Sequence, residues 1–186
     1  MTEQWLEEKS RLSAKAELVR SNEELQMIDK DAVDYLFGLF GESHIRFGDQ
    51  RVPEEDPTIT EMTTKAIEVL TSTVSLSNNL HSILYLLLSY STQDKELKLV
   101  FLQILEKSEN GFFLMVEGGR IDQGHHEGWA QRALNETIAF DAAIEKAISM
   151  VNMTETLVIV TADHSHNMVF SGYAKRGSDV TGTSFD

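Results

Sequence analysis

Two apolar runs in this 186-residue sequence end in side chains that could bind metal ions. Residues 112–117 read FFLMVE and residues 156–162 read TLVIVTA, a composition typical of buried strands. Carboxylates and histidines close or follow each run within a few residues. Oxygen and nitrogen ligands at the carboxyl ends of two buried strands are what a divalent metal site in an open α/β sheet needs.

The first run leads to three candidate ligands. Glu117 ends the run before two glycines, and a carboxylate there suits a hard cation such as magnesium. The plainer alternative is that Glu117 caps the next helix. Asp122 and His126 are four residues apart, so a helix places both on one face, where they could chelate one zinc. The alternative for this pair is an N-terminal cap followed by an exposed histidine.

The second run leads directly to Asp163, His164 and His166. Three potential ligands at the end of a buried strand are costly without partners, because an unpaired buried charge is unfavourable. If the two strands are neighbours, the two clusters meet at one edge of the sheet. The sequence therefore predicts a metal site at that edge.

Periodicity and end signals predict the elements that position these side chains. We predict helices over 2–20, from 21, over 58–70 and over 122–151, and strands within 31–40, over 111–117 and over 156–162. The intervening segment 41–57 contains both prolines and is expected to be loop, and the chain after Ser165 shows no period. The long helix makes a right-handed crossover, so the last two strands are expected to be adjacent and parallel. The fold class is α/β.

Composition narrows the function classes. The net charge of −14 argues against nucleic acid or an anionic membrane surface as a partner. The sequence has no cysteine, so any zinc must be bound by histidine and carboxylate side chains. The first residues, MTEQWLEEKSRL, are charged and predict neither a signal peptide nor an anchor.

The two clusters and their surroundings resemble the alkaline phosphatases, in particular the animal enzymes. The residues that carry the resemblance are VEGGRIDQGHHEG and TLVIVTADHSH, with agreement also in LFGLF and DPTITEMTTKAIEVL. A phosphodiesterase or sulfatase of the same superfamily is disfavoured by the VEGGRID run. The resemblance implies a parallel or mixed sheet flanked by helices, with residues 1–186 forming a partial alkaline phosphatase domain.

The resemblance also implies a metal for each candidate ligand. Glu117 matches the magnesium-ligand glutamate of the family. Asp122 and His126 match two ligands of the first zinc, and Asp163 and His164 match two ligands of the second. The implied reaction is the hydrolysis of phosphomonoesters through a phosphoserine, with two zincs at the attacking and leaving oxygens.

Two further residues of this region are implied to act beside the metal ligands. His166 matches a histidine that hydrogen-bonds the zinc-ligand aspartate, here Asp122, and so fixes its orientation. Gln123 stands near the expected phosphate, where animal members usually carry histidine and bacterial members often carry lysine. That departure predicts altered handling of substrate or metal.

A calcium site is also implied, but the sequence departs from the family there. The Phe40 carbonyl and Asp56 match two of its ligands. Gly41 stands where animal members have a ligand glutamate, which speaks against calcium, and Glu42 could serve only after a shift of one residue.

Segment 71–105 is expected to be an atypical insertion. In the family, the helix matching residues 58–70 is followed within a few residues by the strand beginning GFF, whereas about 35 residues intervene here. Their composition is unlike the flanks. Translated intron, a lineage-specific loop and a membrane-associating hairpin are the three interpretations, the last being the least favoured.

Several parts of the family's machinery have no match in this sequence. There is no Asp-Ser-Ala triplet to supply the serine nucleophile, and the bridging aspartate, the phosphate-binding arginine and a last zinc histidine are not found. We therefore assign no catalytic residue to this chain and expect a fragment or truncated product. Its alternative function is that of a non-catalytic, metal-binding or structural remnant. By family, the enzyme is a homodimer anchored through glycosylphosphatidylinositol at the extracellular face of the plasma membrane.

Overall fold

The computed structural model describes residues 2–72, 82–87, 102–103, 111–169, 172–179 and 181, with backbone alone at 82–87 and 102–103. The helices are α1 (Thr2–Arg11), α2 (Asn22–Met27), α3 (Ile59–Thr71), α4 (Gly119–His126) and α5 (Ala130–Met150), with a short 3₁₀ helix η1 (Gly48–Gln50). The strands are β1 (Ala16–Val19), β2 (Tyr35–Gly38), β3 (Ser82–Leu87), β4 (Leu102–Gln103), β5 (Phe113–Glu117) and β6 (Thr156–Thr161).

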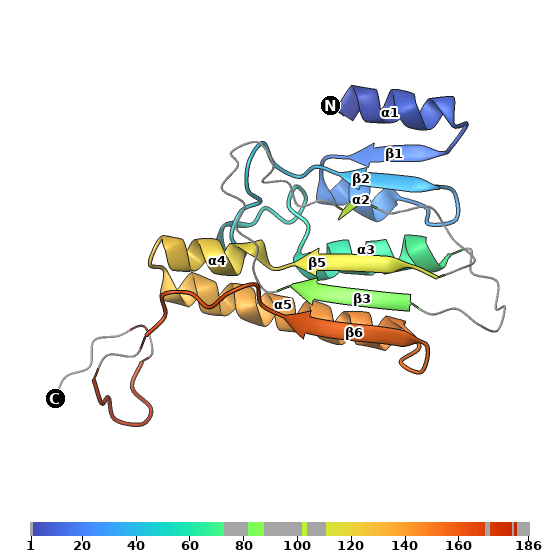
Figure 1. The fold of residues 1–186 in the computed structure, drawn as a ribbon. Helices are drawn as coiled ribbons and strands as arrows, with labels where there is room; N and C mark the ends of the chain where they lie inside the picture. The colour runs from blue at the N-terminus through green and yellow to red at the C-terminus, as the bar shows by residue number, and fades with distance from the viewer. Residues whose placement is uncertain are drawn as a thin grey trace.

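The strands form two three-stranded sheets. In the first sheet β1 pairs with β2 in parallel and β4 pairs with β2 antiparallel. In the second, both β5 and β6 pair in parallel with β3. Figure 1 shows α3 and α5 lying behind the second sheet, with α4 beyond the carboxyl end of β5. This arrangement confirms the α/β class with a mixed set of strands flanked by helices.

The predicted adjacency of the last two strands is wrong. Strand β3 lies between β5 and β6, with Tyr85 opposite Met115 on one side and Ile159 on the other. The three strands run in one direction, as expected. A central parallel strand is buried on both faces and reads as a continuous apolar run without alternation, and for that reason no strand was predicted there. Segment 71–105 therefore supplies the middle of a sheet, while most of its length lies outside the described residues.

The predicted helix over 2–20 is also too long. Helix α1 ends at Arg11, and Ser13 adopts a left-handed backbone conformation with φ of 55°. The chain then enters β1, which pairs with β2 from Ala16 opposite Tyr35 onward. Pairing with a distant strand decides the conformation of this segment, and helical spacing of apolar residues did not reveal it.

One long helix was predicted over 122–151, and the structure contains two. The break falls at Gly128, whose φ of 71° favours glycine, and α5 starts two residues later. Helices α4 and α5 then pack closely: a Cβ built on Gly124 would lie 2.9 Å from the Ala133 backbone nitrogen. Glycine at position 124 therefore sets how near α4 can approach α5.

The other predicted helix starts are confirmed. Ser21 caps α2, with its hydroxyl accepting from the Glu24 N–H. Thr58 and Glu61 form a reciprocal capping box at the start of α3. These caps fix where α2 and α3 begin, and the α3 cap at Thr58 also sets the end of the loop 41–57.

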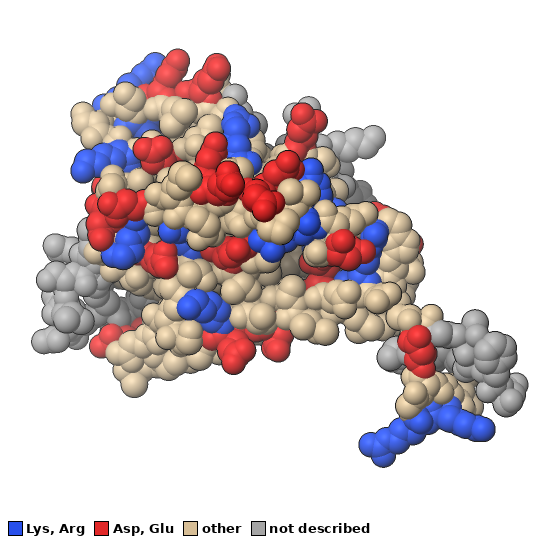
Figure 2. Space-filling view, turned by 180° about the vertical axis from the view of Figure 1, so that it is seen from behind, with Lys and Arg blue, Asp and Glu red and all other residues tan. Residues whose placement is uncertain are grey.

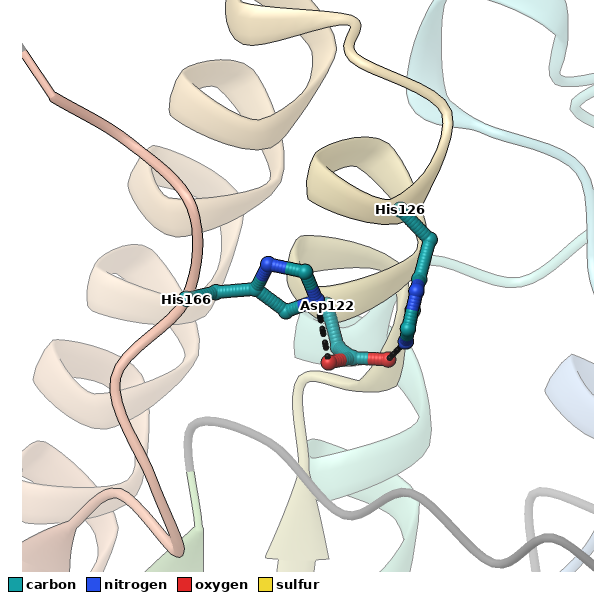
Figure 3. A group of neighbouring side chains, drawn as sticks. All are labelled: Asp122, His126 and His166. Carbon is teal, nitrogen blue, oxygen red and sulfur yellow. Dashed lines mark ion pairs between the residues drawn. The ribbon is translucent and has the colours of Figure 1, made fainter.

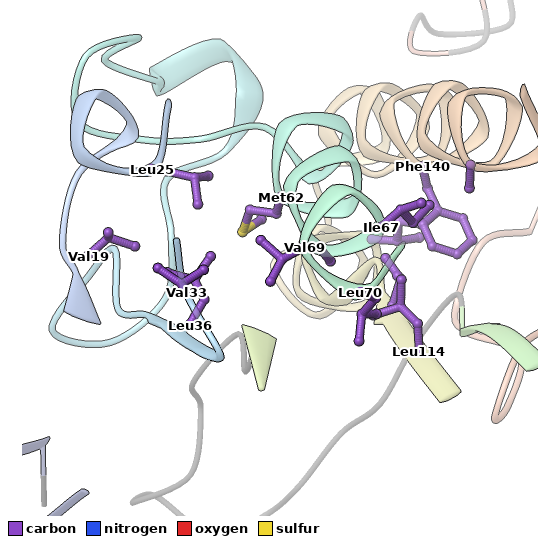
Figure 4. Packing of buried hydrophobic residues seen from close by; sticks show 14 residues of the cluster. Val19, Leu25, Val33, Leu36, Met62, Ile67, Val69, Leu70, Leu114 and Phe140 are labelled. Carbon is purple, nitrogen blue, oxygen red and sulfur yellow. The ribbon is translucent and has the colours of Figure 1, made fainter. Parts of the chain in front are cut away.

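The core lies between α3, α5 and the sheets (Figure 4). Helix α5 buries one face through Ala133, Phe140, Ala143 and Ala147. No helix in the described part of the chain is both long and apolar enough to cross a membrane. Seen from behind, the surface carries intermingled acidic and basic side chains (Figure 2), so the negative net charge is partly paired locally.

Replacing Gly124 should destabilise the chain. Gly124→Val would drive side-chain atoms into the α5 backbone, and overpacking of this kind costs about 1–3 kcal/mol. The free energy of unfolding in urea measures this loss. Ala142→Val adds similar bulk at an exposed position of α5 and should change stability by less than about 0.5 kcal/mol. Equal effects of the two substitutions would contradict the close approach at Gly124.

Candidate metal centre

A buried carboxylate, Asp122, forms the middle of the site. It lies in the first turn of α4, directly after β5 and Gly118, and its side chain is only 5% exposed. Its Oδ2 lies 3.3 Å from Nε2 of His126, one turn further along the same helix. Its Oδ1 lies 3.3 Å from Nε2 of His166, which follows β6 (Figure 3). One carboxylate therefore joins α4 to the segment after β6.

The charge of Asp122 is incompletely satisfied. Its Oδ1 is buried and makes no hydrogen bond of acceptable geometry, although His166 is near. Asp122, His126 and His166 each offer a ligand atom within 4.8 Å of the others, and they are the one such group among the described residues. A buried anionic oxygen without a hydrogen bond is costly, and a bound cation would remove that cost.

The second predicted pair lies beside the first. His164 Nε2 is 3.3 Å from Asp163 Oδ2 and 3.9 Å from Asp122 Oδ1. The structure therefore brings the two clusters to the same end of the sheet, even though β3 separates their strands. Glu117 closes β5 at that end, half-buried. Its part in the same site stays a prediction.

The spacing of the donor atoms fits a tetrahedral metal ion. A tetrahedral zinc with bonds of about 2.0–2.1 Å holds neighbouring ligand atoms about 3.3 Å apart. The pairs Asp122–His126, Asp163–His164 and Asp122–His166 all show this separation. Asp163, His164 and His126 are exposed, whereas Asp122 is buried, so a metal at either pair would be open to an incoming ligand on one side.

Three imidazoles approach Asp122, those of His126, His164 and His166, and a fourth belongs to His125. The ring of His166 stacks on His125 at 5.2 Å between centroids and meets His126 edge-on at 4.5 Å. Burial lowers the pKa of His166, the neighbouring histidines lower it further, and the Asp122 charge opposes them. A neutral imidazole is the form that binds metal or accepts a hydrogen bond. The sequence analysis did not predict His125 as a residue of this site, because only its packing against His166 indicates that it belongs there.

Gln123 points to a polar cluster on the other side of Asp122. Its Oε1 accepts from Arg120 Nη1 at 2.5 Å, which orients its amide nitrogen toward His44, 2.7 Å from Nδ1. Arg120 in turn lies over the Phe47 ring at 3.8 Å. His44 and Arg120 were not predicted from the sequence, because the position of loop 41–57 is set by tertiary packing. Gln123 is therefore held in place from two elements.

The residues of the expected calcium site do not fit that ion. Asp56 is buried, and its Oδ2 already pairs with Arg46 at 2.7 Å and accepts from the Val52 N–H at 2.8 Å. Phe40 is partly buried against the core, and Glu42 is exposed. Where the family has a ligand glutamate, this chain has Gly41, and its Asp56 pairs with Arg46.

Comparison with known proteins decides the family. A sequence profile described as alkaline phosphatase matches residues 1–185. The chain belongs to the alkaline phosphatase family. It is 34% identical over 183 residues to a membrane-bound alkaline phosphatase of Bombyx mori, covering 98% of this chain and 27% of that protein. It is 38% identical over 159 residues to the human tissue-nonspecific isozyme of alkaline phosphatase, covering 86% and 24%.

A solved structure agrees with this assignment. The alkaline phosphatase of Thermus thermophilus superposes with a TM-score of 0.55 at 25% sequence identity, over 81% of this chain and 24% of that one. The chain thus spans about a quarter of the length of these relatives. The resemblance of the two motifs to alkaline phosphatases is confirmed.

Glu136 on α5 holds loop 41–57 against the site. Its Oε1 accepts from the Gly48 N–H at 2.7 Å, while Arg132 binds Asp49 nearby at 2.9 Å. Burial raises the pKa of Glu136, and the Asp49 charge adds to this, against the lowering effects of the Gly48 bond and Arg120. The charged form of Glu136 is therefore less favourable in the folded chain than in the unfolded one.

This pKa shift predicts a pH-dependent stability difference. Because the folded pKa lies above the unfolded value of 4.5, the Glu136 contribution to stability falls as pH rises from about 4.5 through the folded pKa. Glu136→Gln keeps an oxygen for the Gly48 N–H and lacks the ionisation. The variant should gain stability relative to wild type as pH rises through this window, measured by urea unfolding at several pH values. A difference that does not vary with pH would contradict the shift.

Proposed function

We propose that this chain carries part of the metal-binding half of a phosphomonoesterase site. Asp122 and His126 would hold one zinc, and Asp163 and His164 would hold a second. Glu117 would bind magnesium. The observation that carries the proposal is the buried Asp122 oxygen without a hydrogen bond, placed among imidazoles in the motif of an alkaline phosphatase.

The surrounding residues have distinct tasks in this proposal. His166 contacts the Asp122 oxygen opposite His126 and so holds the carboxylate in orientation. Gln123, whose amide binds Arg120 and His44, would lie near the phosphate of the substrate by family. Two zinc ions held by these residues would supply the positive charge that a phosphoryl transfer needs.

The nucleophile is the missing part. The family reaction passes through a phosphoserine, and the sequence contains no Asp-Ser-Ala triplet. We therefore propose that residues outside this sequence complete the catalytic site. The same absence favours the second candidate, a metal-binding chain without turnover of its own. By family, a complete enzyme would be a homodimer anchored at the extracellular face of the plasma membrane.

Zinc binding tests the site directly. Asp122→Asn removes the charge but keeps the shape, and should weaken zinc binding at least about 10–100-fold in a calorimetric titration. Asp141→Asn makes the same chemical change at an exposed position of α5 and should leave zinc affinity unchanged. If the two variants bind zinc equally, Asp122 is not a ligand.

Activity tests whether the chain turns over substrate by itself, which neither candidate predicts. The purified chain, given zinc and magnesium at alkaline pH, should hydrolyse a generic phosphomonoester at a negligible rate, because it has no residue suited to form the phosphoserine. Ser165 lies among the ligands, exposed between two histidines, and is the serine to test. Zinc-dependent turnover that disappears in Ser165→Ala would contradict this and make the chain an enzyme by itself.

A further inference from the structure

A second buried carboxylate, Asp56, lies far from the metal centre in the sequence and has a different partner. It is 3% exposed and immediately precedes Pro57 and the start of α3. A buried aspartate needs a cation or several hydrogen bonds to remain charged. The family resemblance assigns that cation to calcium, together with the Phe40 carbonyl and a glutamate that this sequence replaces with Gly41.

The guanidinium of Arg46 pairs with Asp56. Its Nη1 lies 2.7 Å from Asp56 Oδ2 and 2.7 Å from Glu55 Oε2, bridging two carboxylates. The Val52 N–H donates to the same Asp56 oxygen at 2.8 Å. Two donors on one oxygen leave little room for a metal ion there.

A second arginine binds the backbone carbonyl oxygen of Asp56. Arg51 Nε donates to the Asp56 carbonyl at 2.5 Å, and its Nη2 pairs with Glu61 Oε2 at 2.9 Å. Glu61 is also the acid of the α3 capping box. Calcium requires six to eight oxygen ligands, and at this position arginine nitrogens bind the carboxylate and the carbonyl instead.

The position of the missing glutamate is itself crowded. A Cβ built on Gly41 would lie 3.3 Å from the His44 carbonyl oxygen and 3.6 Å from its carbon. A side chain at 41 therefore requires the turn at 41–44 to open slightly. That turn carries His44 to Gln123, so the glycine suits the local path of the chain.

We propose that Arg46 replaces a divalent cation at Asp56 and that loop 41–57 is held without calcium. The arginine acts as a permanent counter-ion that ties Glu55 and Asp56 together beside the first turn of α3. The backbone carbonyls of Glu54 and Glu55 accept from Glu23 and Asn22 at the start of α2. The loop thereby also fixes α2, and through His44 it reaches the polar cluster around Gln123.

The wild-type chain gives the first test. Its melting temperature should be the same in excess EGTA and in millimolar calcium, with zinc and magnesium absent. A site that calcium fills at a hundred times its dissociation constant would raise Tm by about 5–10 °C. A rise of that size, removed by EGTA, would overturn the proposal.

Variants at Arg46 give the second test. Arg46→Met leaves the Asp56 and Glu55 carboxylates facing each other without a counter-ion, so Tm in EGTA should fall and calcium should partly restore it. Arg46→Lys keeps the charge and should remain insensitive to calcium. Arg11→Met, an exposed arginine on α1, should change neither Tm nor the calcium response. If Arg46→Met melts at the wild-type temperature in EGTA, Arg46 is not the counter-ion.

The double variant checks that the calcium response arises at Asp56. In Arg46→Met with Asp56→Asn, the buried charge is gone together with its partner, so added calcium should no longer raise Tm. A calcium response that persists in the double variant would place the ion elsewhere and overturn the assignment. All of these measurements use the folded chain and are independent of phosphatase activity.

Discussion

The site depends on one buried carboxylate that two separate segments share. Asp122 contacts His126 on its own helix and His166 beyond β6, one through each oxygen. The His126 contact is set by the helix that carries both residues. The His166 contact also depends on the position of α4, which packs closely on α5 at Gly124. Displacing α4 would separate the carboxylate from His166, so helix packing and site geometry are a single constraint.

The two buried aspartates, Asp56 and Asp122, have partners of different charge. Asp56 pairs with an arginine and accepts from a backbone N–H, so it has a cationic partner inside the protein. Asp122 meets imidazoles, and the pKa of His166 is lowered by burial and by the other histidines, which favours its neutral form. Asp122 therefore retains an unbalanced negative charge where Asp56 does not. This contrast is the physical reason to expect a metal at the first and none at the second.

Local signals in the sequence were sufficient for part of the fold. The caps at Ser21 and Thr58 and the apolar runs before Glu117 and Asp163 gave α2, α3, β5 and β6. The i,i+4 spacing of Asp122 and His126 gave their shared face. The position of β3 between β5 and β6 could not be predicted, because strand order depends on non-local pairing. The roles of His44 and Arg46 depend on the path of loop 41–57, which local pattern does not encode.

The two proposed zinc pairs differ in how they are held before any ion arrives. Asp122 and His126 lie on a helix, so their separation is set by the helix and little conformational entropy is lost on binding. Asp163 and His164 lie in an exposed segment after β6, and ordering that segment opposes binding. His164 lies within 3.9 Å of Asp122, so an ion on the helical pair would lie close to the second pair. Cation binding at α4 would thus help to fix the segment after β6, coupling the two ends of the crossover through one carboxylate.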